Sequence, residues 1–85
     1  MNLYVMANGG QVLNKLRLLA RTGARVNQAM RIATFPDGRE IHFATIPHLS
    51  EFCAGKSFDE VEIDPGLRLT PEHRALLRAH TRSAA

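Results

Sequence analysis

The order of apolar and polar residues predicts a strand and then a helix at the start of the chain. Leu3 to Ala7 is short, apolar and partly β-prone, which is typical of a buried strand. Asn8-Gly9-Gly10 predicts a tight turn, because glycine has no Cβ and tolerates unusual dihedral angles. From Gln11 to Thr22 the apolar residues recur at helical spacing, and Gly23 is a natural helix stop. This region is therefore predicted to form a βα unit.

From Val26 to Ile46 the pattern changes to a period of two residues. Side chains alternate from Met30 to Phe35 and again from Ile41 to Ile46. Between these runs, Pro36-Asp37-Gly38 supplies a preset φ, a side-chain acceptor and a residue that adopts positive φ. Two alternating runs around such a turn predict a β-hairpin.

The next part of the chain predicts one more strand. Pro47 to Ser57 is expected to be a loop or one short helical turn. From Phe58 to Asp64, Val61 and Ile63 point to one side while acidic residues point to the other, which is typical of a half-buried strand. The acidic side is either a solvated strand face or a surface for a basic partner.

The last predicted element is a helix that begins after Thr70 and runs to about Thr81. Threonine is a favoured N-cap, Pro71 suits the first helical position, and Glu72 places an acid in the first turn. Residues 82–85 form a tail that is expected to fray.

Together these elements give the order β-α-β-β-β-α in a single domain of residues 1–85. The βα unit suggests a sheet covered by helices, to which the hairpin adds antiparallel strands. We therefore expect a small α/β domain with a mixed sheet and a central β-hairpin; an α+β arrangement is the alternative. The aromatic residues are expected in its core: Tyr4, Phe35, Phe43, Phe52 and Phe58.

The composition excludes several classes of protein. It is 45% hydrophobic and 22% charged, which is ordinary for a globular domain, and it has no run of about 18 apolar residues that could cross a membrane. The single cysteine, Cys53, cannot form an intrachain disulfide, which fits a reducing cytoplasm. No zinc-motif spacing links it to the histidines, so we expect no metal site and no cofactor. The histidines are His42, His48, His73 and His80.

Charge is unevenly distributed along the chain, whose net charge is +3. Residues 1–34 carry five basic side chains and no acid, residues 35–66 carry two basic side chains and seven acids, and residues 67–85 carry four arginines and one glutamate. Basic ends and an acidic middle suggest complementary packing within one chain or between copies, so a homo-oligomer is expected, most simply a dimer.

Two basic helix faces are candidate binding surfaces for nucleic-acid phosphates. One is a stripe of arginines four residues apart, Arg74, Arg78 and Arg82; the other is a looser patch made of Lys15, Arg17 and Arg21. The alternative is that both faces are simply solvated. No aromatic residues are interleaved with these basic residues, so stacking of single-stranded bases is not indicated.

Gly55-Lys56-Ser57 has the letters that close a phosphate-binding loop of the type GxxxxGK[ST]. Ser50 stands where the pattern needs its first glycine, and the residues after Ser57 are patterned as a strand. Such a loop must instead enter a helix, whose N-terminus faces the phosphates. The turn at Asn8-Gly9-Gly10 does precede a helix and could bind an anion, but a tight βα turn explains it as well.

A longer stretch of the chain resembles a known family. "LYVMANGGQVLNKLRLLAR", "TFPDGREIHFAT" and "CAGKSFDEVEID" are similar to the middle of the ATPase domain of phage large terminases and related helicase-like motors, over about residues 3–64. The resemblance implies that Gly55 and Lys56 match a loop residue pair and Asp64 a magnesium-binding aspartate. Pro65 stands where the family has its catalytic glutamate, and no upstream phosphate loop is present. The resemblance thus implies a non-catalytic relative of phage or mobile-element type.

These observations favour a non-catalytic interaction protein that self-associates and binds another macromolecule, with a host or phage protein as a possible partner. We expect no enzymatic activity, no membrane partner and a cytoplasmic location, in the host cell if the protein is phage-encoded. Two other functions remain open: a basic nucleic-acid-binding module, and a degenerate nucleotide-binding remnant that uses Gly55, Lys56, Ser57 and Asp64.

Overall fold

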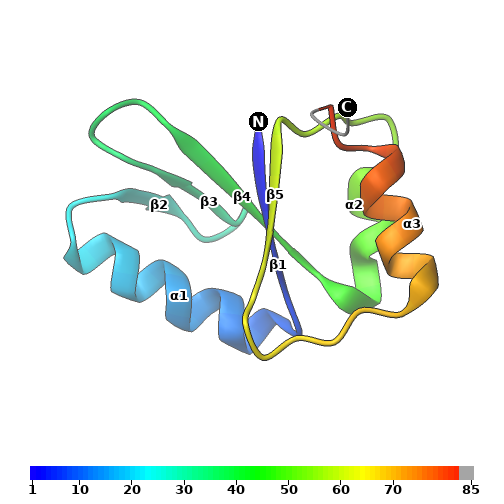
Figure 1. The fold of residues 1–85 in the computed structure, drawn as a ribbon. Helices are drawn as coiled ribbons and strands as arrows, with labels where there is room; N and C mark the ends of the chain where they lie inside the picture. The colour runs from blue at the N-terminus through cyan, green and yellow to red at the C-terminus, as the bar shows by residue number, and fades with distance from the viewer. Residues whose placement is uncertain (83–85) are drawn as a thin grey trace.

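The computed structural model describes residues 1–82, which form one five-stranded sheet with helices on both of its faces (Figure 1). The strands are β1 (Asn2–Met6), β2 (Arg25–Asn27), β3 (Ile32–Thr34), β4 (Glu40–Thr45) and β5 (Glu60–Ile63). The helices are α1 (Gly9–Arg21), the 3₁₀ helix η1 (Ile46–His48), α2 (Leu49–Cys53) and α3 (Pro71–Ala79).

The sheet is mixed, with the strand order β2-β3-β4-β1-β5. β1 lies between β4 and β5 and is parallel to both, whereas β2, β3 and β4 form an antiparallel meander. In the register, Tyr4 of β1 stands opposite Phe43 of β4 and Glu62 of β5. The α/β class and the mixed sheet with its hairpin are confirmed.

The pleat of β1 sends its side chains alternately into two hydrophobic cores. The core beneath α1, here called the α1-side core, consists of Tyr4, Met6, Val12, Leu16, Ala33 and Phe43. The core beneath α2 and α3, here called the α3-side core, consists of Leu3, Val5, Ala44, Leu49, Cys53, Phe58 and Leu77. Figure 1 shows α1 on one side of the sheet and α2 and α3 together on the other. The domain is therefore a three-layer α/β/α sandwich.

α1 begins two residues earlier than its sequence pattern predicts. The side chain of Asn8 accepts a hydrogen bond from the Gln11 N–H at 3.0 Å, so Asn8 is the N-cap and the two glycines lie in the first helical turn. At the other end Gly23 has φ +99°, and the Ala24 N–H donates to Leu19 O. A glycine in this conformation ends the helix as expected.

The predicted hairpin at Pro36-Asp37-Gly38 is present, and a second hairpin precedes it. The Arg39 N–H donates to Asp37 Oδ1 at 3.0 Å, and Gly38 has φ +90°. β2 pairs with β3 through a turn at residues 28–31 that the alternation does not reveal. In this turn Asn27 Oδ1 accepts from the Met30 N–H, and Arg31 has φ +56°.

The segment from Ile46 to Cys53 forms two short helical elements, η1 and α2, where a loop or one helical turn was predicted. β5 is shorter than its predicted range, because Phe58 is joined to Thr81 by an isolated bridge instead of belonging to the strand. The observed order of elements therefore adds β2, η1 and α2 to the predicted one.

α3 begins as predicted, with the Thr70 side chain accepting from the His73 N–H and Pro71 in the first turn. At Arg82, the first residue of the tail that is predicted to fray, the N–H donates to Phe58 O at 2.7 Å. The rest of that tail lies outside the described residues. Within residues 1–82, no helix has both the length and the apolar character needed to cross a bilayer.

Candidate functional site

Gly55-Lys56-Ser57 forms a helix-to-strand connection, where a phosphate loop would need a strand-to-helix connection. The segment follows α2 and leads towards β5, and Gly55 has φ +71° just beyond the end of the helix. Lys56 Nζ donates to Phe52 O at 2.9 Å and lies 4.1 Å from the centre of the Phe52 ring. The lysine therefore binds a carbonyl at the end of α2 and covers an aromatic ring, two roles that explain it without a phosphate.

Asp64 lies at the opposite, carboxyl end of β5. Its Oδ1 accepts from the Tyr4 hydroxyl at 3.1 Å, and its N–H donates to Val5 O at 3.0 Å. Burial raises the pKa of the Tyr4 hydroxyl, and the hydrogen bond to the Asp64 carboxylate raises it further. Asp64 is thus hydrogen-bonded to two residues of β1 at the end of the β1–β5 pair.

The structure does not bring Lys56 and Asp64 together. β5 alone has four residues and lies between them, which amounts to about 13 Å at the usual strand rise. The four residues predicted for a nucleotide-binding remnant therefore fall at two ends of one strand. The physical reason is the fold order: the Gly-Lys loop enters the strand whose far end carries the aspartate.

In the turn at Asn8-Gly9-Gly10, the Asn8 side chain accepts a hydrogen bond from the backbone N–H of Gln11. Asn8 caps α1, and the guanidinium of Arg31 approaches the helix start so closely that a Cβ added to Gly9 would lie 3.0 Å from Arg31 Nη2. Gly9 thus allows the approach of Arg31. Sequence reasoning missed this neighbour, because it depends on the unpredicted β2–β3 turn.

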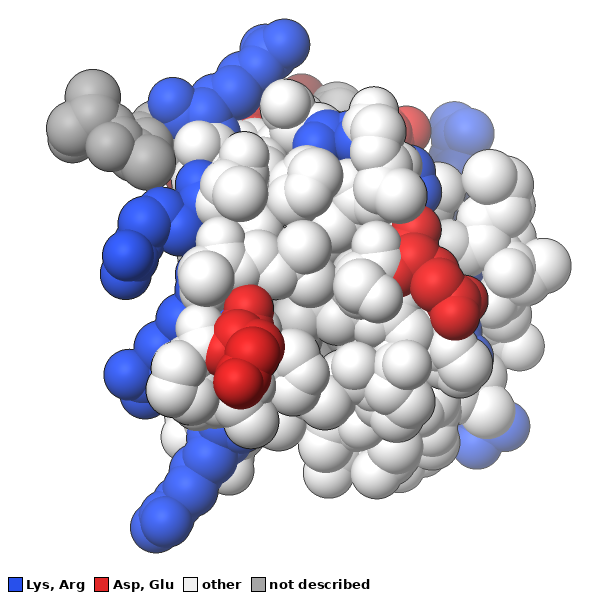
Figure 2. All heavy atoms as spheres, turned by 90° about the vertical axis from the view of Figure 1, so that its right-hand side faces the viewer, with Lys and Arg blue, Asp and Glu red and all other residues white. Residues whose placement is uncertain are grey.

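The two basic surfaces lie on opposite layers of the sandwich and do not form one surface. Arg74 and Arg78 are exposed on α3, and neither side chain makes an ion pair within residues 1–82. Arg82 lies beyond the end of α3, and its Nη1 is 3.7 Å from Asp59 Oδ1. Figure 2 shows the α2–α3 side, where basic side chains gather along one flank and acidic ones lie on the face beside them.

The basic patch predicted on α1 is divided. Arg17 and Arg21 are exposed on its outer face, beside the 57% exposed Leu18. Lys15 instead lies against the sheet, with Nζ 5.6 Å from the centre of the Tyr4 ring. Only Arg17 and Arg21 therefore remain as a basic pair on the outside of this helix.

The acidic residues of β5 stand at an edge of the sheet. Val61 and Ile63 pack against the α3-side core, so Glu60 and Glu62 point to the α1 side. No residue of β5 belongs to the α1-side core, and both glutamates are exposed there. We call Glu60 and Glu62 the acidic edge. The alternating pattern of the sequence indicated their common side, and the strand order places them at the sheet edge.

Cys53 is buried in the α3-side core with no exposed surface. Burial raises the pKa of its thiol, which keeps it protonated and unreactive near neutral pH. Across residues 1–82, no three His, Cys, Asp or Glu side chains gather in a way that could hold a metal ion.

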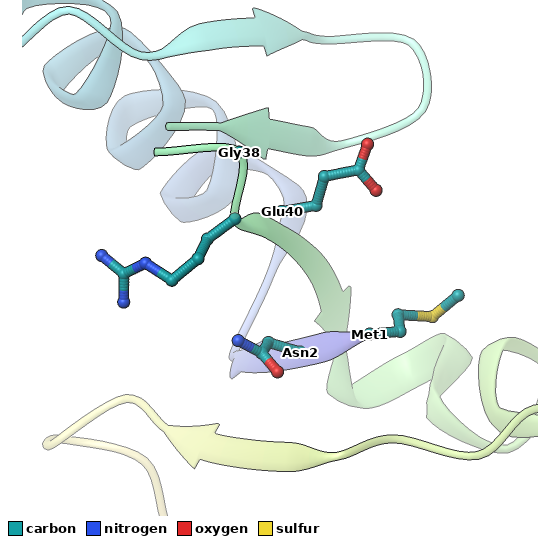
Figure 3. Close-up of a pocket in the computed structure, with 5 residues that line it drawn as sticks. Met1, Asn2, Gly38 and Glu40 are labelled. Atoms are coloured by element: carbon teal, nitrogen blue, oxygen red, sulfur yellow. The ribbon is translucent and has the colours of Figure 1, made fainter. Parts of the chain in front are cut away.

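The hollows found at the surface of residues 1–82 are open to solvent. The one drawn in Figure 3, of about 310 Å³, lies between the β3–β4 turn and the start of β1. Its labelled side chains diverge from one another. Arg39 in its wall is already paired with Asp37, with Nε 2.8 Å from Oδ2. This hollow therefore offers no acid, base and nucleophile aimed at one point.

Comparison of the chain with models of protein families, with curated proteins and with solved structures found no match. The resemblance to the motor ATPases therefore stays a prediction.

Proposed function

We propose that this protein is a non-catalytic interaction protein that associates with itself and binds another macromolecule. The observation that supports it is the separation of charge in space: the acidic edge on β5 carries Glu60 and Glu62, and the outer helix surfaces carry arginines. Complementary charged surfaces steer and orient association. A phage or mobile-element origin and action in the cytoplasm belong to the same proposal; they rest on the sequence resemblance and the single cysteine.

Self-association is supported by the different directions in which the basic and the acidic surfaces of one molecule face. α1 and α3 carry their exposed arginines on the two outer layers, whereas the acidic edge lies at the end of the sheet. Because the two kinds of surface face different directions, an arginine on a helix of one copy can approach Glu60 or Glu62 of another copy. A small domain also gains stability when association buries surface that its own core cannot cover.

Sedimentation velocity between about 1 and 100 µM protein tests this proposal directly. We expect the average mass to rise with concentration at low salt and to fall when salt is raised, because exposed charges are screened beyond about 10 Å at 0.1 M salt. A strict monomer across this range at low salt would contradict self-association.

Nucleic-acid binding is the second candidate function, favoured by the two unpaired arginines of α3. Arg74 and Arg78 are one helical turn apart and exposed, so both guanidinium groups can reach neighbouring phosphates. The neighbouring Arg82 is ion-paired with Asp59, so it should contribute less to phosphate binding.

Fluorescence anisotropy with a labelled DNA duplex or single-stranded RNA tests the second candidate. We expect the Arg74→Ala/Arg78→Ala variant to bind more weakly and to lower the salt slope by about two, one unit for each lost phosphate contact. Arg17→Ala/Arg21→Ala is the matched control, since it removes the same charge from α1. Equal losses in both variants, or no binding by the original protein at low salt, would contradict a site on α3.

A further inference from the structure

β5 has a backbone edge that no other strand of residues 1–82 covers along its length. In a parallel pair, every second residue of an edge strand turns its N–H and C=O away from its neighbour. The Asp64 N–H donates to Val5 O. Glu60 and Glu62 lie four and two residues before Asp64, so their backbone N–H and C=O groups also point towards β1, while their side chains point to the α1 side. The backbone groups of Val61 and Ile63 are then left facing outward.

The chain itself forms one backbone bridge close to the start of β5. Immediately before β5, the Phe58 N–H donates to His80 O at 2.7 Å, and the Arg82 N–H donates to Phe58 O at 2.7 Å. Phe58 and Thr81 thus form a parallel bridge outside β5. This bridge ends before the strand begins, so the positions opposite Val61 and Ile63 stay open within the described chain.

The two faces of this edge differ in chemistry. On the α1 side stand the carboxylates of Glu60 and Glu62. A hollow of about 190 Å³ lies beside them on the sheet surface, with Tyr4 and Ile41 in its floor and walls. On the other side, half-buried apolar side chains continue the α3-side core; they include Val61, Ile63 and Leu69. An added strand would therefore meet acids on one face and apolar groups on the other.

We propose that the outer edge of β5 binds an extended segment of a partner protein in which basic and apolar residues alternate. Side chains of paired strands lie about 4.5–5.5 Å apart, so lysines or arginines on one face of that segment would reach the acidic edge. The intervening apolar residues would lie beside Val61 and Ile63. Backbone hydrogen bonds to these two residues would supply affinity, as in other cases of strand addition.

The acidic edge also determines what does not bind. Two copies of β5 placed edge to edge would bring four glutamates together, and like charges in opposed positions are destabilising. Acids on an edge strand are a known device against such pairing. The edge therefore selects a basic partner over a second β5. This inference rests on the proposed interaction function and names the partner chemistry of one surface.

The test uses short synthetic peptides and isothermal titration calorimetry at low salt. The probe is an acetylated peptide with the core Lys-Val-Lys-Val-Lys. One control groups the same three lysines before the two valines; another carries N-methyl groups on the amides that would face β5. We expect the alternating peptide to bind at least about tenfold more tightly than either control, since only it offers both the charges at alternate positions and the backbone donors.

Variants of the protein locate the site. We expect Glu60→Gln/Glu62→Gln to weaken the alternating peptide about tenfold, while Glu51→Gln/Glu72→Gln, on the helix layer across the sheet, leaves it unchanged. Glu60→Lys/Glu62→Lys should instead prefer Glu-Val-Glu-Val-Glu. Far-UV circular dichroism verifies the fold of each variant. Bound peptide should also slow hydrogen exchange at the Val61 and Ile63 amides in the original protein.

The outcomes separate this inference from the proposed function. Equal affinity for the alternating and grouped peptides, or no binding at about 1 mM, overturns strand docking at β5. If no peptide binds and Glu60→Gln/Glu62→Gln abolishes self-association, the occupant is a second copy and the inference is overturned. A strict monomer that binds the alternating peptide overturns only self-association.

Discussion

The two faces of the sheet are covered in different ways. On one face a single regular helix, α1, covers the α1-side core, and it follows directly from β1 in the chain. On the other face two short helices and α3 cover the α3-side core, which collects residues from Leu3 to Leu77. One face is covered by a single helix that follows its strand directly in the chain, the other by helices that come from distant parts of the sequence.

This difference shows where regular patterns suffice and where they do not. The helical spacing of α1 places Val12 and Leu16 in the core, as predicted. By contrast, Leu49 and Cys53 are buried, although the segment from Pro47 to Ser57 has no clear period. Their burial is decided by the crossover from β4 to β5, which passes beneath α3.

The largest expected effect compares one buried aromatic residue from each face. Phe43 and Phe58 have 1% and 0% exposure, so Phe43→Ala and Phe58→Ala should each lower the free energy of unfolding by about 3–5 kcal/mol through lost burial and a cavity. Urea unfolding followed by circular dichroism measures both. A loss under about 1.5 kcal/mol at either position would show that the corresponding face contributes little packing energy.

The next effect concerns two buried titratable groups, Tyr4 on one face and Cys53 on the other. Tyr4→Phe removes the 3.1 Å hydrogen bond to the Asp64 carboxylate and should cost about 1.5 kcal/mol at pH 7. Burial raises the pKa of both the Tyr4 hydroxyl and the Cys53 thiol. Above their usual pKa values the unfolded chain releases these protons while the folded chain keeps them, so rising pH favours unfolding.

The pH dependence of stability distinguishes the contribution of Cys53 on one face from that of Tyr4 on the other. Stability should fall from about pH 8.5 through Cys53 and from about pH 10 through Tyr4. Cys53→Ala should remove the earlier part of this fall and Tyr4→Phe the later part, as measured by urea unfolding at a series of pH values. A variant whose alkaline slope matches that of the original protein would show that its group does not contribute.

A smaller effect compares the caps of the helices on the two faces. Asn8→Ala and Thr70→Ala each leave a backbone N–H of α1 or α3 without its side-chain acceptor and should cost about 1 kcal/mol. Asn14→Ala, an exposed change in the middle of α1, is the control and should stay within about 0.5 kcal/mol. Thermal unfolding of the three variants gives the comparison; a control that loses as much as the caps would speak against capping.

The last prediction is that nucleotide has no effect on stability. ATP with Mg²⁺ should leave the melting temperature unchanged, because Lys56 and Asp64 lie at opposite ends of β5. Differential scanning fluorimetry with the original protein and Lys56→Ala is the measurement. A rise that Lys56→Ala abolishes would restore the nucleotide-binding remnant, since ligands stabilise only the states that bind them.

Several features of the fold were predictable because they depend on neighbours in sequence. The turn at Gly38, the stop at Gly23 and the cap at Thr70 each follow from side-chain or backbone preferences of a few residues. β2 was not predictable from the pattern, because only three residues pair and their partner strand defines them. The same holds for Arg31, whose contact with the start of α1 depends on that pairing.

The candidate surfaces divide in the same way. The sequence identified Arg74, Arg78 and Arg82 as a stripe and Glu60 and Glu62 as a common side, because helices and strands have fixed periods. It could not show that Lys15 lies against Tyr4, or that Arg82 lies near Asp59. Those contacts join residues brought together only by the sheet.

By itself, the sequence determined the α/β class, the main elements and the segregation of charge, since these depend on periodicity and composition. Tertiary structure alone decided that "GKSFDEVEID" is the loop and edge strand of a sheet, with Lys56 and Asp64 held at its two ends. Strand order is set by pairing and packing between distant segments. No local pattern encodes which strand becomes the edge, and that placement gives the acidic residues of β5 their open side.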